Sequence, residues 1–252
     1  MTTAMASKKQ TSSGGFGETL RTVVYAVLIA IALRTFAFEP FSIPSGSMLP
    51  TLLVGDYIFV SKYSYGYSRY SFPWSLDLFD GRILAQPVER GDVVVFKLPT
   101  DNSTDYIKRI IGLPGDEIQV KEGRLYINGT MVQREEVGSG TVSAFGGYAV
   151  RVTEYIESLP NGVQHRIWER SDNEFFDNTP AYRVPQGHYF AMGDNRDSSQ
   201  DSRSPQVGYV PYENLIGEAQ IVFFSHDGSA HWWEVWKWPL AVRYGRLLTV
   251  IR

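Results

Sequence analysis

The stretch PSGSM, residues 44–48, places two serines in a short turn that could perform nucleophilic chemistry. A serine hydroxyl is a weak nucleophile at neutral pH and needs a neighbouring base. The chain has four histidines, but none lies in a local catalytic signature, and neither a G-x-S-x-G elbow nor an S-x-x-K motif occurs. A lysine therefore remains as the candidate base.

Lys108 has surroundings that differ from those of the other lysines. It lies inside the apolar run YIKRII, residues 106–111, whereas the others lie in the N-terminal tail, at strand ends or among tryptophans. Burial among apolar side chains lowers the pKa of a lysine by several units and produces the neutral amine that a general base requires. A second interpretation stays open at this point, because a charged residue also protects an exposed edge strand from pairing with another sheet.

A third polar stretch, GDNRDSSQDSR at residues 193–203, gathers aspartate, asparagine, serine and arginine in one predicted loop. Alone it could be a solvated turn or a calcium loop, although the D-x-[DN]-x-[DN]-G calcium pattern is not met. The chain has no cysteine, which excludes a thiol nucleophile, a thiolate metal site and a disulfide. No H-x-x-x-H pair occurs, so we do not expect a zinc site, and acyl transfer by a serine and a lysine needs no metal or cofactor.

The element that precedes the serine turn is an apolar run, residues 22–38, interrupted only by Arg34. As a helix it would be about 25 Å long, which just spans a hydrocarbon core of about 30 Å if the ends adjust. Lys8, Lys9 and Arg21 precede the run, so the positive-inside rule predicts a cytoplasmic N-terminus. A cleaved secretory signal is the alternative, but bulky residues follow the run where a polar cleavage region would be needed.

After Pro40 the chain shows short β-rich runs separated by turn signals, with no long helical periodicity before the C-terminus. The pair Asn128-Gly129 is the strongest hairpin signal among these turns. The sequence thus predicts a mostly β protein with one N-terminal transmembrane helix. The runs are residues 57–60, 93–96, 106–111, 117–120, 124–128, 188–192 and 219–224.

The C-terminal segment changes character, because it is rich in tryptophan and ends in an apolar stripe. Pro239 can open a helix there, and a helical period places five apolar side chains on one face. This amphipathic helix could dock on the protein's own core or lie at a membrane interface, and both interpretations stay open. The stripe is Leu240, Tyr244, Leu247, Leu248 and Ile251.

We divide the chain into six segments by composition. The polar stretches VGSGTVSAFGG and ERSDNEFFDNTP distinguish an inserted second β-region from the main core. The segments are a disordered cytoplasmic tail (1–19), a transmembrane anchor (20–38), a first part of the β core (39–115), the inserted β-region (116–186), a second part of the β core (187–229) and the Trp-rich C-terminal segment (230–252).

Five stretches, in this order, resemble the type I (leader) signal peptidases of bacteria, which are membrane-bound serine proteases with a Ser–Lys dyad. They are the apolar anchor running into EPFSIPSGSMLPTL, then GDYIFVSKYSYG, RGDVVVF, YIKRIIGLPGD, and GDNRDSSQDSR followed by GYVP. The resemblance implies an all-β catalytic domain of the signal-peptidase type. It also implies that the substrates are secretory preproteins, cleaved after small residues in an A-x-A pattern.

The resemblance assigns roles to individual residues. Ser47 becomes the nucleophile and Lys108 the general base, while the Ser45 hydroxyl and the Ser47 backbone N–H form the oxyanion hole. Ser199 would hydrogen-bond the Lys108 amine and orient it, and a glutamine at 200 would trim the substrate pocket. The residues expected to brace the loop are Asp201, Arg203 and Arg109. The residues expected to line shallow apolar pockets are Ile43, Pro44, Met48, Leu52, Tyr106 and Ile107.

The resemblance also implies a location. The chain would be a single-pass protein of the bacterial inner (plasma) membrane, with its catalytic domain on the periplasmic or extracytoplasmic side. Ser47 follows Phe38 by nine residues, which would keep it near the lipid surface where the signal helices of its substrates lie. Pro44 and Pro50 restrict the turn, and Gly46 permits close approach of a substrate. The lipid bilayer is therefore an expected partner.

Other classes of function fit the sequence less well. The formal charge of −3 and the lack of a long basic run indicate no nucleic-acid partner. An anchored, non-catalytic envelope protein that binds peptides would give no reason for Ser47, Lys108 and Ser199 to occur together. A related Ser–Lys peptidase that processes a conjugation pilus stays open, whereas a self-cleaving repressor would need a DNA-binding domain, and none precedes the β body.

Overall fold

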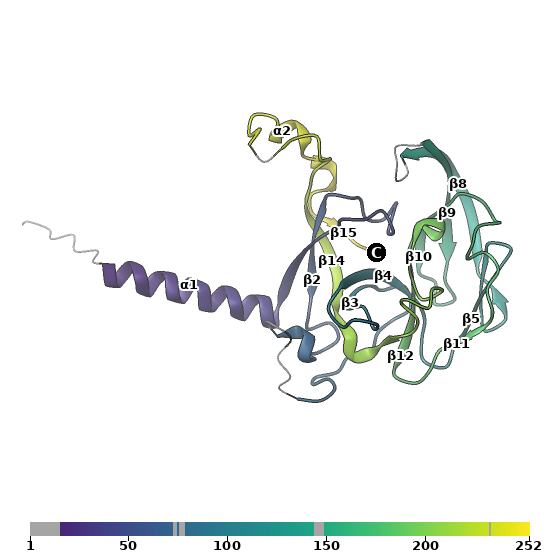
Figure 1. Cartoon of the computed structure of the whole chain (residues 1–252), viewed down its shortest axis with the longest axis horizontal. Coiled ribbons are helices and arrows are strands. Elements are labelled where there is room, and N and C mark those ends of the chain that lie inside the picture. Colours follow the sequence, from purple (N-terminus) through teal and green to yellow (C-terminus); the bar gives the residue numbers. More distant parts are fainter. Residues whose placement is uncertain (1–15, 73–74, 76–78, 144–148, 232) are drawn as a thin grey trace, which may run out of the picture.

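The N-terminal helix extends away from a body of β-strands (Figure 1). The structure is a computed structural model that describes residues 16–72, 75, 79–143, 149–231 and 233–252. Helix α1 (Phe16–Phe36) has mostly exposed apolar side chains, and among the described residues only Gly17–Phe36 is long and apolar enough to cross a membrane. The helix ends at Phe36 and not at Phe38, because Phe38 begins strand β1 (Phe38–Ser42).

An eight-stranded sheet forms the centre of the body, in the order β1-β2-β14-β3-β4-β12-β13, with β15 beside β14. Because β12 pairs with β4, the loop that follows β12 lies next to the strand that carries Lys108. The strands after β1 are β2 (Asp56–Ser61), β3 (Val93–Lys97), β4 (Asp105–Gly112), β12 (His188–Met192), β13 (Val210–Pro211), β14 (Leu215–Ser225) and β15 (Thr249–Val250). Short 3-10 turns are η1 (Arg69–Ser71), η3 (Arg196–Ser198) and η4 (Tyr212–Asn214).

Two smaller sheets come from the chain between β4 and β12, and they lie on the side of the body away from α1 (Figure 1). One has the order β11-β5-β6-β7, and the other has the order β10-β9-β8. Their strands are β5 (Glu117–Lys121), β6 (Arg124–Ile127), β7 (Thr130–Met131), β8 (Gln133–Ser143), β9 (Ala149–Ser158), β10 (Gln164–Glu169) and β11 (Tyr182–Arg183).

Local turn chemistry predicted the β6–β7 hairpin, and the structure confirms it. Ile127 pairs with Thr130, so the loop is the dipeptide Asn128-Gly129. Both loop residues have positive φ, 53° and 77°, as a two-residue type I′ turn requires.

The first part of the stretch VGSGTVSAFGG is a strand where the sequence predicted a loose segment. Residues 137–143 of it belong to β8, which pairs with β9 over its whole length. Residues 144–148 lie outside the described residues. Glycine and serine have low strand propensity, so pairing with the distant β9 supplies the order that local sequence lacks.

Lys108 lies on β4, an interior strand of the sheet, and its side chain is only 3% exposed. Strand β4 pairs along its length with β3, where Lys108 is opposite Val94, and from Arg109 onward it also pairs with β12. Strand β3 is buried on both faces, since Val93 and Val95 join one apolar cluster and Val94 joins another. The interpretation of Lys108 as a charge that protects an edge strand is therefore wrong.

The predicted C-terminal amphipathic helix is also wrong. Only Trp238–Ala241 is helical (α2), a 3-10 turn η5 (Tyr244–Arg246) follows, and the last residues form β15. Strand β3 pairs only with Leu215–Glu218 of β14, which leaves the later backbone groups of β14 free for β15. Leu248 has φ +59°, which ends any helical path.

The type I′ hairpin provides a test of the fold. We expect Gly129→Ala to destabilise the protein by about 1 kcal/mol, because a side chain at positive φ costs about that much. Gly140→Ala in β8 is the matched control, since a Cβ there would meet nothing within 4 Å and the backbone φ is not positive. Urea unfolding in detergent measures both variants, and equal midpoints would contradict the turn assignment.

Candidate active site

The side chains of Ser47 and Lys108 meet although 61 positions separate them in the chain. Lys108 Nζ lies 2.8 Å from Ser47 Oγ and 2.8 Å from the carbonyl oxygen of Ile107. Ser47 lies in the turn between β1 and β2, and Lys108 lies on β4. Their relative exposures are 9% and 3%, so water is largely excluded from the contact.

The environment of Lys108 favours its neutral form. Burial lowers the pKa of the amine to about 8, while the nearby carboxylates of Asp201 and Asp194 act in the opposite direction. Desolvation dominates because an ammonium loses its hydration shell on burial. The neutral amine, which can accept a proton, is therefore far more populated near neutral pH than in an exposed lysine. Among the described residues, no group of three or more histidine, aspartate or glutamate side chains could hold a metal ion.

Two further donors face the position of Ser47 Oγ. Ser45 is exposed, and its hydroxyl lies 3.4 Å from Ser47 Oγ. The backbone N–H of Ser47 donates no hydrogen bond to any described residue. The Ser47 N–H is thus free to bind an oxygen that carries negative charge, and the Ser45 hydroxyl can do so by giving up its contact with Ser47 Oγ.

A pocket of about 380 Å³ opens over the serine and the lysine. Four of the six residues expected to line apolar pockets do line it, and Gln200 also contributes. The expected residues in this wall are Ile43, Pro44, Tyr106 and Ile107.

Met48 and Leu52 do not line the pocket, which corrects the sequence-based expectation. Both are fully buried in the apolar cluster that contains Ile58 and Val60. Because their side chains pack into this cluster and away from solvent, they fix the serine turn to the sheet. Apolar character alone cannot distinguish a pocket wall from a core anchor.

Ser199 does not make the expected hydrogen bond to the Lys108 amine in this structure. Its hydroxyl is buried and has no hydrogen-bond partner among the described residues. Ser199 lies against Gly193, where an added Cβ would stand 2.2 Å from Ser199 Oγ and 2.5 Å from the Ser47 carbonyl oxygen. Gly193 therefore lets the loop approach the serine turn closely.

Buried ion pairs hold the loop of residues 193–203. Asp201 Oδ2 lies 2.9 Å from Arg203 Nη2 and accepts the backbone N–H of Gly193 at 3.0 Å. Burial raises the pKa of Asp201, but the adjacent Arg203 outweighs it and leaves the pKa lowered. Arg109 pairs with the loop through a different acid, Asp194, in a bidentate contact of 2.9 and 2.8 Å.

Asp194 and Asn195 connect this loop to the serine turn, and the sequence analysis assigned them no role. Asp194 Oδ2 accepts the Thr51 hydroxyl at 2.5 Å. Asn195 donates its side-chain N–H to Gly46 O at 2.9 Å and its backbone N–H to Ser47 O at 3.1 Å. Their position within the GDNRD stretch was the only signal in the sequence.

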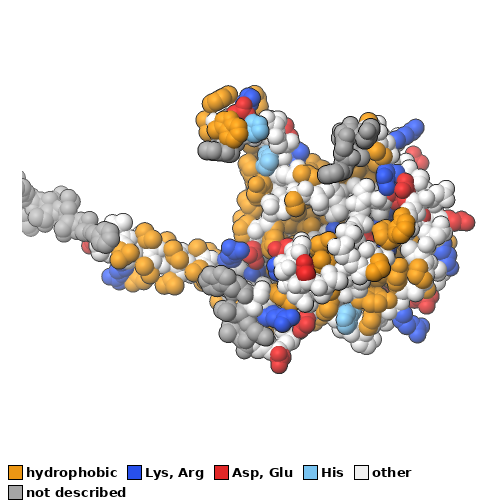
Figure 2. Space-filling view, viewed as in Figure 1, with side chains coloured by type: hydrophobic (Ala, Val, Ile, Leu, Met, Phe, Trp, Pro, Cys, Tyr) orange, Lys and Arg blue, Asp and Glu red, His pale blue; other side chains and the backbone are white. Residues whose placement is uncertain are grey.

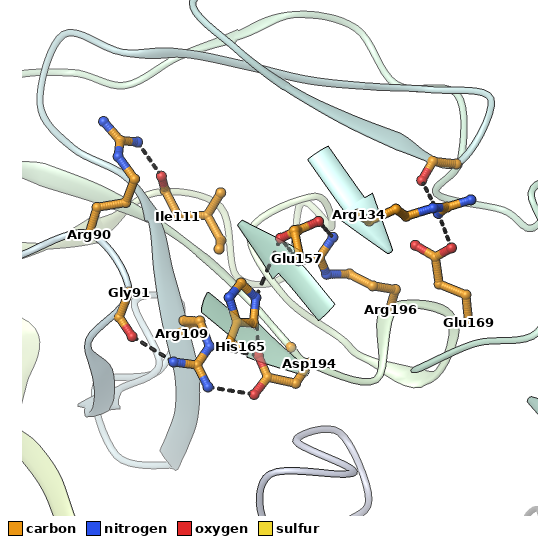
Figure 3. A network of polar contacts seen from close by, with 12 residues as sticks. Arg90, Gly91, Arg109, Ile111, Arg134, Glu157, His165, Glu169, Asp194 and Arg196 are labelled. Carbon is orange, nitrogen blue, oxygen red and sulfur yellow. Dashed lines mark hydrogen bonds and ion pairs between the residues drawn. The ribbon is translucent and has the colours of Figure 1, made fainter. Parts of the chain in front are cut away.

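A buried histidine extends the network into the inserted strands (Figure 3). His165 Nε2 on β10 lies 3.9 Å from Asp194 and 3.4 Å from Glu157 of β9. Glu157 in turn pairs with Arg196 of the loop at 2.8 Å. Burial, with Arg109 nearby, lowers the pKa of His165, so a neutral ring separates two ion pairs. Strands β9 and β10 of the inserted region thus support the loop of residues 193–203.

Comparison with known proteins places this geometry in a family. Residues 16–224 match the model of "Signal peptidase, peptidase S26". The chain is 44% identical over 218 residues to Signal peptidase I of Rickettsia typhi, covering 83% of this chain and 80% of that protein. It is also 44% identical over 219 residues to Signal peptidase I of Rickettsia massiliae, with 84% and 80% covered. A crystal structure of a signal peptidase I from Enterococcus faecalis aligns with 53% of this chain and 97% of its own, at 26% identity and a TM-score of 0.31.

The buried amine predicts a pH-dependent cost to stability. The folded-state pKa of Lys108, about 8, lies below the ordinary value of 10.5. Below about pH 8 both states are protonated and the fold carries the full penalty, which disappears as pH rises from 8 to 10.5. We expect Lys108→Met to be more stable than the unaltered protein at pH 7, and this gain to shrink by about 2 kcal/mol at pH 9.5.

Urea unfolding at the two pH values measures the gain, with Lys121→Met, which replaces an exposed lysine, as the control. An equal gain at both pH values would contradict the burial of a titrating amine at position 108.

Proposed function

The chain belongs to the signal peptidase family, peptidase S26, and we propose that Ser47 is its nucleophile and Lys108 its general base. Members of this family are serine endopeptidases that remove signal peptides from secreted precursors, and this chain does the same. The observation that carries the residue assignment is the contact of 2.8 Å between Ser47 Oγ and the buried Lys108 Nζ. No cofactor has a role in the proposal.

The reaction proposed is acyl transfer through a covalent intermediate. Ser47 Oγ attacks the scissile carbonyl carbon while the neutral Lys108 amine takes its proton. The Ser47 N–H and the Ser45 hydroxyl donate to the oxyanion of the tetrahedral intermediate. The Lys108 ammonium then protonates the leaving amine, and water, activated by the same amine, releases the acyl group from Ser47.

The pocket supports cleavage after small residues. Its walls beside the two reacting side chains are apolar, through Ile43, Pro44 and Ile107, and Gln200 occupies part of its rim. Small side chains of an A-x-A sequence can enter such a pocket without displacing the strands. We propose this pattern as the substrate preference, and Asp201, Arg203, Arg109 and Ser199 as residues that position the loop behind the dyad.

The protein is membrane-anchored through α1, and we propose the bacterial inner membrane with a cytoplasmic N-terminus. Three basic residues support the orientation: Lys8, Lys9 and Arg21. The catalytic domain then lies on the extracytoplasmic side, where precursors emerge. Of the residues assigned to the anchor, 20–36 belong to α1, Ala37 is a linker, and Phe38 begins β1.

A second membrane contact is proposed for the segment around α2. This segment projects from the body, and apolar side chains cover much of it and of α1 (Figure 2). Trp236, Trp238 and Leu240 are exposed. Tryptophan and leucine on a projecting segment favour the bilayer interface over docking on the protein's own core.

Loss of either member of the dyad should abolish cleavage. We expect Ser47→Ala and Lys108→Ala each to reduce kcat/KM for a secretory precursor in detergent by about 10³-fold or more. Removal of one oxyanion donor in Ser45→Ala should cost about 10²- to 10³-fold. Timed cleavage, with the product sequenced at the A-x-A site, measures all three.

Ser139→Ala and Lys121→Ala are the matched controls, because both residues are exposed on strands away from the dyad. Retention of appreciable activity by either dyad variant, with normal unfolding curves, would refute the assignment.

The absence of native cysteine makes the membrane contact directly testable. We expect a nitroxide on Leu240→Cys, in protein reconstituted into vesicles, to be more accessible to oxygen than to a water-soluble nickel complex. Val137→Cys on β8 is the control, since it replaces an exposed apolar residue on a strand remote from α1. A Leu240 label that reports water like the control would contradict the contact.

A further inference from the structure

A second pocket, of about 240 Å³, adjoins the pocket over the dyad. Phe41 and Asp105 line both pockets, so they form the shared wall. Arg34 and Thr35, at the end of α1, line the second pocket and mark its side nearest the membrane anchor. The two pockets are thus consecutive along a path from the dyad to the anchor.

The two pockets differ in chemistry. The first is apolar beside the dyad, whereas three cations and two carboxylates line the second. The cations are Arg34, Lys62 and Lys97, and the carboxylates are Glu39 and Asp105. Glu39 pairs with both Arg34 and Lys62, and Asp105 pairs with Lys97. The lining therefore has an excess of one positive charge.

Unused hydrogen-bonding capacity remains in this lining. Lys62 is buried, and its Nζ contacts Glu39 Oε2 at 2.8 Å and Ser71 O at 2.7 Å. An ammonium has three N–H donors, so one is left for a ligand. Thr35 is only 4% exposed, and its hydroxyl has no partner among the described residues. A group that accepts hydrogen bonds would satisfy both.

We propose that this second pocket is a polar subsite for the part of the signal peptide that precedes the cleavage site. It takes a side chain that accepts hydrogen bonds, a carboxamide or a carboxylate, and it discriminates against lysine and arginine. The inference rests on the proposed function, because only a precursor held at Ser47 with its signal helix in the bilayer passes this pocket.

The register of β4 indicates which substrate residue reaches the pocket. Asp105 precedes Lys108 by three residues, which is about 10 Å along a strand. An extended substrate covers this length in about three residues. The pocket therefore faces residues about four to six positions before the scissile bond.

The test uses the full chain in detergent and a precursor with glutamine, glutamate, alanine or lysine at each of the fourth, fifth and sixth positions before the scissile bond. We expect kcat/KM for glutamine or glutamate to exceed that for lysine by about fivefold at one of them, which corresponds to about 1 kcal/mol. Lys97→Gln should reduce this ratio towards one. Lys97→Arg should restore the ratio, and Lys121→Gln should leave it unaltered.

The outcomes separate this inference from the proposed function. If the unaltered protein cleaves all precursors equally, the subsite is refuted and the peptidase assignment stands. If no precursor is cleaved, or if Ser47→Ala cleaves as well, the proposed function fails and the subsite with it. A third outcome is that the ratio of kcat/KM values is one, and that phosphatidylglycerol in mixed micelles changes the rate of the unaltered protein but not of Lys97→Gln. The pocket then binds lipid phosphate, and the subsite is refuted.

Discussion

Desolvation of one amine is the constraint on which the rest of this structure depends. Lys108 must lose enough hydration to release its proton near neutral pH, yet two carboxylates, Asp194 and Asp201, lie close enough to stabilise its charged form. Each of these acids has its own buried arginine, Arg109 and Arg203. Burial is nevertheless the largest effect on the amine, and its pKa stays below the ordinary value.

The sheet makes this arrangement possible by alternation. Lys108 and Arg109 are neighbours on β4, so their side chains leave opposite faces of the strand. Lys108 contacts Ser47 and Arg109 contacts Asp194. Asp194 in turn accepts a hydrogen bond from Thr51 of the serine turn. The turn is thus held from both faces of one central strand, and a change in the loop would be felt at the nucleophile.

Lys62 shows that burial by itself does not identify a base. Its side chain is as buried as that of Lys108, and burial likewise lowers its pKa, but Glu39 pairs with it directly. Lys108 has no carboxylate within ion-pair distance among the described residues. A contacting acid at Lys62 and none at Lys108 is therefore one clear difference between the two lysines, and it suits Lys62 to a polar pocket and Lys108 to a dyad.

Local sequence determined the elements whose signals lie within a few residues. The apolar run of α1, the Asn128-Gly129 hairpin and the β-rich strands β3, β4 and β12 follow from composition and turn chemistry. The residue types of Ser47 and Lys108 indicated the chemistry. The family resemblance added the pairing of these two residues.

Tertiary structure decided what depends on partners distant in the chain. β8 became a strand because β9 pairs with it, and the C-terminal residues left a helical pattern because β14 offered free backbone groups. Met48 and Leu52 turned inward because a core cluster lay beneath the serine turn. The local sequence around a residue cannot predict a strand edge or a cavity that distant residues form. Hydrogen bonds and burial are properties of the folded chain.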